Sequence, residues 1–150
     1  MNNREETPLP APVYVIASPS LRNTRSRWDR QRAELAALCP GMQMITWDDL
    51  PSAFHDVPPP ERPARLARVL AGAVIVPDKL GRPPRRWIGR AALSEVLAFE
   101  SVGKPAHAYI AGELVPWACL AVRRNVHGSP RWLPVEVIAP RFLEQPGAAA

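Results

Sequence analysis

The sequence lacks long apolar runs. Its longest apolar stretches, such as residues 70–77, fall far short of the roughly 20 residues that a membrane-spanning helix needs. The first twelve residues carry acids and prolines where a secretion signal would need an apolar run. We therefore expect a cytoplasmic protein that makes no membrane contact.

Cysteine is scarce, and no metal-binding pattern is visible. Cys39 and Cys119 can form at most one disulfide, and their spacing is not that of a metal site. His55, His107 and His127 share no ligand spacing with each other or with the cysteines. A glycine-rich phosphate loop of the GxxxxGK type is also missing. We expect buried thiols, no metal and no cofactor.

The composition is that of one globular domain with an excess of positive charge. The 150 residues are 47% hydrophobic and 22% charged, which is enough for a folded core. The net charge is +5, and 17 of the 19 basic residues are arginine. Arginine binds phosphate and carboxylate groups through a planar fork, which favours an anionic ligand. A GC-rich genome would enrich arginine equally, so charge alone does not identify the partner.

Alternating strand and helix patterns predict an α/β fold. Short apolar runs predict four strands, and helical periodicity predicts three helices between them. The strands are expected at residues 13–17, 42–47, 73–76 and 105–110, and the helices at 24–39, 61–71 and 88–102. Such alternation is typical of a mostly parallel sheet, here of about five strands, with helices on both faces.

The remaining segments connect or flank these elements. Residues 1–12 and 143–150 are expected to be disordered tails, which leaves a single domain over 13–142. We expect a polar loop at 77–86 and an irregular, proline-punctuated segment at 51–63. Residues 114–122 and 133–139 are predicted strands that either extend the sheet or form a separate hairpin.

The residues that follow each strand are the candidates for a binding site. Ligands of open α/β sheets bind beyond the carboxyl ends of the strands. Ser18 and Ser20 follow the first strand, Asp48 and Asp49 the second, and Asp78 the third. Serine hydroxyls and backbone amides at such a position can contact a ribose or a phosphate, or simply cap a helix.

One stretch of the chain shows a recognisable order of features. An apolar strand ends near Asp78, a variable loop leads to the small-residue turn at 88–92, Glu95 follows in the next helix, and residues 103–105 (Gly-Lys-Pro) open the next strand. Together with the Ala-Ser-Pro turn at 17–19, this order resembles the nucleoside 2-deoxyribosyltransferase-like superfamily, and its uncharacterised members most of all. The resemblance covers roughly residues 13–110 and implies a three-layer Rossmannoid fold of the flavodoxin-like kind.

That resemblance implies a reaction and assigns residues to it. The family cleaves or transfers the N-glycosidic bond of a nucleoside or nucleotide through a covalent sugar ester. Glu95 would be the nucleophile near a helix N-terminus, and Asp78 would protonate or hydrogen-bond the departing base. Family members also assemble as homo-oligomers. The residues expected to bind substrate are Ser18, Ser20, Arg86, Trp87, Gly89 and Arg90.

The arginines before the last predicted helix are the densest basic cluster in the chain. If Arg82, Arg85, Arg86 and Arg90 flank the site, they would hold a 5′-phosphate and favour a nucleotide over a nucleoside. Trp87 would then stack on the base. A solvated loop or an interface is the other interpretation of this cluster. We interpret the second basic run, at residues 22–32, as a solvated helix face.

The chain also departs from the family pattern. Gly89, Ala91 and Ala92 stand where the transferases carry residues that include a sugar-binding carboxylate or hydroxyl. The family tyrosine is replaced by Val15, and Tyr14 lies one residue earlier, which would turn it to the other face of the sheet. These departures favour an alternative: a catalytically inactive nucleotide- or nucleic-acid-binding regulator or partner subunit on the same fold. Nucleic-acid binding through the arginine clusters alone is a third hypothesis.

Overall fold

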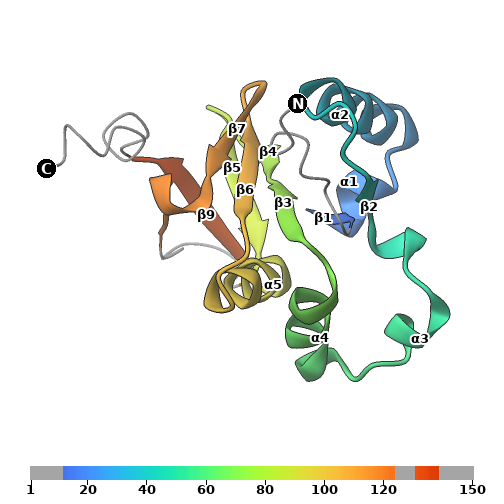
Figure 1. Ribbon diagram of the computed structural model, residues 1–150. Helices are drawn as coiled ribbons and strands as arrows, with labels where there is room; N and C mark the ends of the chain where they lie inside the picture. Colours follow the sequence, from blue (N-terminus) through green and yellow to red (C-terminus); the bar gives the residue numbers. More distant parts are fainter. Residues whose placement is uncertain (1–11, 124–130, 139–150) are drawn as a thin grey trace, which may run out of the picture.

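A computed structural model describes residues 12–123 and 131–138 (Figure 1). The tails expected at 1–12 and 143–150 lie outside the described residues, apart from Pro12. The carbonyl oxygen of Pro12 accepts a 3.0 Å hydrogen bond from the backbone N–H of Ala71, the residue before β3. Most of the connecting loop expected before the last strand, and the end of the domain at 139–142, also lie outside the described residues.

The first sheet has five strands and is mostly parallel, as the sequence predicts. Their order across the sheet is β2-β1-β3-β6-β7, and only β7 runs antiparallel, against β6. The strands are β1 (Val13–Ala17), β2 (Met44–Ile45), β3 (Gly72–Val76), β6 (Ala106–Ile110) and β7 (Glu113–Pro116).

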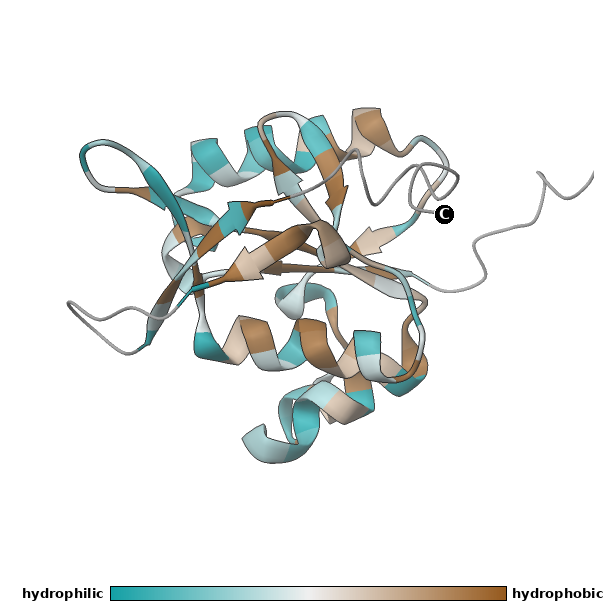
Figure 2. Ribbon diagram, turned by 90° about the vertical axis from the view of Figure 1, so that its left-hand side faces the viewer, coloured by the Kyte–Doolittle hydropathy of each residue, from teal (hydrophilic) through white to brown (hydrophobic). Residues whose placement is uncertain are grey.

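Helices pack against both faces of this sheet (Figure 2). Ile16 and Ile75 belong to the apolar cluster that contains Phe99 of α5 (Arg90–Ser101) and Leu66 of α4 (Arg62–Val69). The neighbouring residues of β1 and β3 point the other way, into a second cluster formed with α2 (Arg25–Leu38). Because helices cover both faces of the sheet, the central strands are continuous apolar runs in the sequence.

A second, antiparallel sheet lies beside the first, in the order β4-β5-β9-β8. Its strands are β4 (Asp78–Leu80), β5 (Arg85–Gly89), β8 (Leu120–Val122) and β9 (Trp132–Val137). The polar loop expected at 77–86 and the helix start at 88 are therefore wrong. Ile88 pairs with Leu133, and both are buried, so a partner far away in sequence makes a strand where local periodicity favours a helix.

The C-terminal strands resolve the alternative that the sequence leaves open. The segment expected as one strand over 114–122 divides into β7, the 3-10 turn η3 (Trp117–Cys119) and β8. β7 extends the first sheet, whereas β8 and β9 enter the second. Cys119 is buried and Cys39 is half-buried, and both thiols are free.

Several short elements were not expected. Helix α1 (Pro19–Arg22) precedes α2, and the 51–63 segment contains α3 (Ser52–His55) and η2 (Pro59–Glu61). The turn η1 (Trp47–Asp49) follows β2 directly. Two apolar helix residues, Leu97 of α5 and Leu38 of α2, are exposed. The end of α5 is as expected, because Gly103 adopts a φ of 75° just after it.

Within the described ranges, no helix is long and apolar enough to cross a membrane. The same part of the chain contains no group of three or more histidine, cysteine, aspartate or glutamate side chains placed to hold a metal ion.

Candidate functional site

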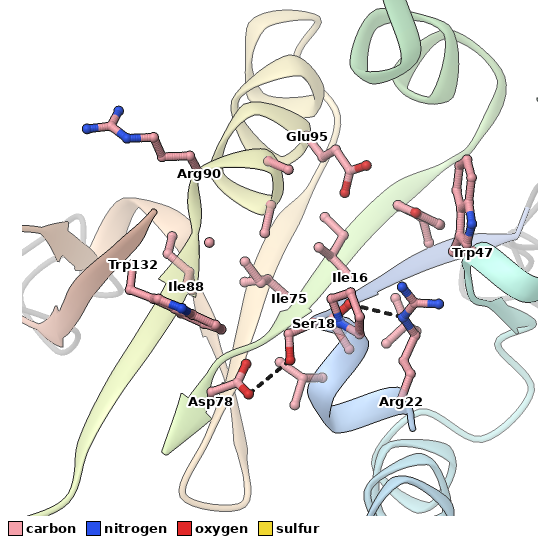
Figure 3. Close-up of a pocket in the computed structure, with 18 of the residues that line it drawn as sticks. Ile16, Ser18, Arg22, Trp47, Ile75, Asp78, Ile88, Arg90, Glu95 and Trp132 are labelled. Carbon is pink, nitrogen blue, oxygen red and sulfur yellow. Dashed lines mark hydrogen bonds between the residues drawn. The ribbon is translucent and has the colours of Figure 1, made fainter. Parts of the chain in front are cut away.

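A cavity of about 620 Å³ opens at the carboxyl ends of β1 and β3, between α5, α1 and the second sheet (Figure 3). Its floor is apolar and includes Ile16, Ile75 and Ile88. The polar and aromatic side chains around this floor are Tyr14, Ser18, Arg22, Trp47, Arg62, Asp78, Glu95 and Trp132. The cavity therefore lies where the sheet topology predicts a ligand site.

Asp78 and Ser18 are joined at one side of the cavity. The Ser18 hydroxyl donates a 2.9 Å hydrogen bond to Asp78 Oδ2, and Ser18 Oγ itself accepts a 3.1 Å bond from the N–H of Leu21. Ser18 thus caps α1 while it fixes the Asp78 carboxyl. Burial raises the pKa of Asp78, although the Ser18 hydrogen bond and the charge of Arg27 act in the opposite direction.

Glu95 projects from α5 into the same cavity, across the floor from Asp78 (Figure 3). Burial raises the pKa of its carboxyl to about 7, while the positive charges of Arg22 and Arg62 favour the ionised form. A carboxyl with this pKa changes its charge near neutrality. Both acids that the sequence singled out are therefore brought to one cavity.

Tyr14 lies on the cavity side of β1, which corrects the expectation that its position turns it away. It lines the cavity and belongs to the same apolar cluster as Ile16. Burial raises the pKa of its hydroxyl, and the nearby negative charge of Glu95 raises it further. The hydroxyl stays protonated at neutral pH and remains a hydrogen-bond donor.

Two arginines border the Glu95 side, and each is held in place. Arg22 donates from Nε to the carbonyl of Ala17 at 3.2 Å and forms an ion pair with Asp48 at 3.3 Å. Its side chain is only 16% exposed. The basic run at 22–32, interpreted as a solvated face, therefore contributes a cavity residue at its first position.

The other arginine, Arg62, fixes the segment that precedes α4. It donates to the carbonyls of Val57 at 2.8 Å and His55 at 3.3 Å. Its guanidinium lies 4.9 Å from the ring centre of Trp47, and the His55 ring meets the same indole edge-on at 4.3 Å. Trp47 is half-buried and forms a cavity wall between these contacts.

The second sheet supplies the remaining wall. Gly89 and Arg90 line the cavity, and the backbone N–H of Arg90 donates a 3.0 Å bond to the carbonyl of Arg131. This bond joins the start of α5 to the start of β9, which places Trp132 over the Asp78 side. The Arg90 side chain points away from the cavity in Figure 3.

Three expected binding residues lie outside the cavity lining. Ser20 is exposed on α1. Arg86 lines a smaller hollow, with Arg85 and Glu136. Trp87 pairs with Asp78 across β4 and β5, and the guanidinium of Arg85 lies 6.0 Å from its ring centre. The arginine cluster before α5 therefore lies along the β4–β5 hairpin, and only Arg90 reaches the cavity lining.

Comparisons with protein-family models, with curated proteins and with solved structures find no match to this chain. What the cavity can do therefore follows from its own chemistry. Two carboxyls with raised pKa values face one apolar floor, one of them beside two arginines. Such a pair can divide the roles of nucleophile and proton donor, because their environments differ.

Only weak sequence signals mark the cavity residues that were not predicted. Six residues line the cavity although the sequence analysis assigns them to no site: Tyr14, Arg22, Trp47, Arg62, Arg131 and Trp132. Arg22 and Trp47 each follow a strand by a few residues, at the edge where ligands bind. Arg62 and Trp132 come from segments whose position depends on tertiary contacts, and no local pattern marks them.

Proposed function

We propose that the protein cleaves or transfers the N-glycosidic bond of a nucleoside or nucleotide. The observation that carries this proposal is the approach of Glu95 and Asp78 to one cavity. These are the two acids that the resemblance to nucleoside 2-deoxyribosyltransferase-like proteins assigns to the reaction. They come from different elements, α5 and β4, so their meeting is not a consequence of sequence proximity.

In the proposed reaction, the ionised Glu95 carboxylate attacks the anomeric carbon of the sugar. The bond between that carbon and the base nitrogen breaks, and its electron pair goes to the base, which takes a proton from Asp78. The product is a sugar ester on Glu95. Water or a second base then attacks the same carbon, releases the carboxylate and returns a proton to Asp78.

The surroundings of both acids suit these roles. Burial raises the pKa of Asp78, which favours its role as a proton donor, and burial disfavours the free carboxylate of Glu95, which makes that group more reactive. Arg22 and Arg62 preserve an ionised fraction at neutral pH. Trp47 and Trp132 supply flat apolar walls against which a base or sugar can pack.

We also propose a three-layer, flavodoxin-like fold, on the basis of the same resemblance to nucleoside 2-deoxyribosyltransferase-like proteins. The order β2-β1-β3-β6-β7, with helices on both faces, agrees with a flavodoxin-like three-layer arrangement, in which strands follow the order 2-1-3-4-5. The antiparallel β7 departs from that pattern. A cytoplasmic homo-oligomer is also part of this proposal, and sedimentation of the purified protein tests the assembly.

Base release tests the proposed chemistry. Nucleosides, deoxynucleosides and their monophosphates are incubated with the protein, and free base is measured by chromatography. Glu95→Gln should abolish release, whereas Glu100→Gln, at an exposed acid of the same helix, should not. A 2-fluoro-2-deoxynucleoside should trap the ester, and peptide mass spectrometry should place it on Glu95. Release that survives Glu95→Gln would contradict the proposal.

A second candidate function is nucleotide binding without chemistry. Gly89, Ala91 and Ala92 all line the cavity, so the wall where the transferases carry polar groups is here without side-chain donors or acceptors. In that case no base is released from any compound, but a nucleotide still raises the melting temperature. The substitution Glu95→Gln would then leave the thermal shift intact.

A further inference from the structure

A second hollow, of about 460 Å³, lies next to the cavity and shares Asp78 with it. It is formed between α2, Leu21 and the start of β4. Its charged lining consists of Arg27, Arg30, Lys79, Glu34 and Asp78. The two spaces therefore adjoin at Asp78.

The two acids of this hollow are already engaged by other groups. Glu34 Oε1 accepts a 2.5 Å hydrogen bond from the Tyr109 hydroxyl, and Asp78 accepts one from Ser18. The three cations are not engaged in this way. Among the residues that the structure describes, the side chains of Arg27, Arg30 and Lys79 have neither a hydrogen-bonded partner nor an ion pair within salt-bridge distance.

The hollow also contains an unsatisfied polar atom. Gln31 Oε1 is buried and has no hydrogen-bond partner, the only such side-chain atom found within the described ranges. A buried acceptor without a donor is costly, so this oxygen is an energetically unfavourable feature of the wall. Because it is closed off from solvent, the groups that can contact a ligand in the hollow are the three cations.

We propose that this hollow binds an oxyanion of the substrate, held by Arg27, Arg30 and Lys79, while the nucleoside occupies the cavity beyond Asp78. The oxyanion is either a phosphate on the sugar or a carboxylate on the base, since both suit a guanidinium fork. The identity of the nucleoside part rests on the proposed function, whereas the anion site does not. The arginines of the β4–β5 hairpin, expected to hold the phosphate, are not part of this site.

Binding to the Glu95→Gln protein tests this site without chemistry. The ligands are uridine, uridine 5′-monophosphate, uridine triphosphate and orotidine, which is uridine with a carboxylate on its base. An anionic ligand held by charge-assisted bonds should bind about tenfold or more tightly than uridine, as measured by calorimetry. Tighter binding of the phosphates alone, or of orotidine alone, identifies the oxyanion. Equal affinity for all four compounds would overturn the proposal.

Substitutions test whether the hollow is responsible for the difference in affinity between the anionic ligands and uridine. Arg27→Gln with Arg30→Gln should remove most of the preference for the anionic ligand, and Lys79→Gln should reduce it. Arg25→Gln is the matched control, because Arg25 is exposed on the same helix but does not line the hollow. A preference that persists in the double variant, or is lost equally in the control, would overturn the assignment.

Binding of inorganic pyrophosphate tests the anion site independently of the proposed glycosidic function. Pyrophosphate binding that the double arginine variant weakens supports the anion site even if the wild-type protein releases no base. Base release without any anion preference supports the glycosidic chemistry and rejects the anion site. If neither pyrophosphate nor any anionic compound binds, the anion site is rejected as well. The exchanged arginine and lysine side chains are exposed, so thermal melting should show that these variants fold as well as the Glu95→Gln protein that carries them.

Discussion

The Ser18 hydroxyl donates a 2.9 Å hydrogen bond to Asp78, a residue 60 positions further along the chain. This bond joins the turn after β1 to the first residue of β4, and it therefore connects the two sheets at the cavity. Ser18 also caps α1 through the N–H of Leu21. The Ser18 hydroxyl therefore stabilises the start of α1 and also connects the end of β1 to the start of β4.

Ser18→Ala should destabilise the protein by about 1 kcal/mol, since it removes a helix cap and a side-chain hydrogen bond. It should also raise the pKa of Asp78 further, because the Ser18 bond lowers it. Urea unfolding measures the first effect. Ser20→Ala, two residues away and exposed, is the control and should change stability little. Equal losses in both variants would mean that the Asp78 bond contributes nothing specific.

Gly72→Ala should be destabilising for a different reason. A Cβ at this position would lie 2.8 Å from the carbonyl oxygen of Pro105, which already accepts a hydrogen bond from Ala73. The starts of β3 and β6 would have to separate, at a cost of about 1–3 kcal/mol. Thermal unfolding measures this loss. At Gly89 the nearest atom is 3.9 Å from the added Cβ, so Gly89→Ala should cost much less.

The sequence predicts the first sheet well because its signal is local. β1 has the predicted bounds, 13–17, and four of its five residues are buried, which is why the run is continuously apolar. The second sheet was missed because its hairpin is polar and rich in proline, and because strand β5 is stabilised by pairing with β9, 43 or more residues away. Ile88 is the clearest case, since its apolar side chain fits either a helix start or a buried strand.

The same distinction applies to the site. Ser18 and Asp78 follow strands, and Glu95 lies in the second turn of α5, and their positions along the chain place them at the cavity edge. Arg62 reaches the cavity only because carbonyls of the preceding segment and the Trp47 ring hold it there. Its sequence neighbours on α4, Arg65 and Arg68, are exposed. The pattern of charged residues alone therefore does not distinguish Arg62 from these two arginines.

The buried carboxyl of Glu95 should make stability fall as the pH rises. Its pKa is about 7 in the folded protein and near the ordinary 4.5 when unfolded, so the folded state binds the extra proton between these values. The free-energy cost of holding the ionised Glu95 carboxyl in the folded protein is absent below the lower pKa. It is complete above the higher pKa, where it is on the order of 3 kcal/mol. Glu95→Gln should therefore stabilise the protein at about pH 8 but not at about pH 4.

Urea unfolding of both proteins across this pH range provides the measurement. Glu100→Gln is the control, because that acid is exposed on the same helix and its removal should not change the pH dependence. A difference between wild type and Glu95→Gln that is constant with pH would mean that the Glu95 carboxyl ionises at its ordinary pKa in the folded protein.

The charge of Arg22 should set the pH at which Glu95 becomes ionised. Arg22 is the larger of the two charges that favour the carboxylate, ahead of Arg62. Arg22→Gln should raise the pKa of Glu95, and Arg22→Lys should largely preserve it. If Glu95 attacks as a carboxylate, base release by Arg22→Gln should fall several-fold at about pH 6 and recover at about pH 9. Carbon-13 NMR of labelled glutamate follows the same titration without relying on activity. Loss of release that is equal at both pH values, with the Glu95 titration unmoved, would show that Arg22 acts by contact with the substrate instead.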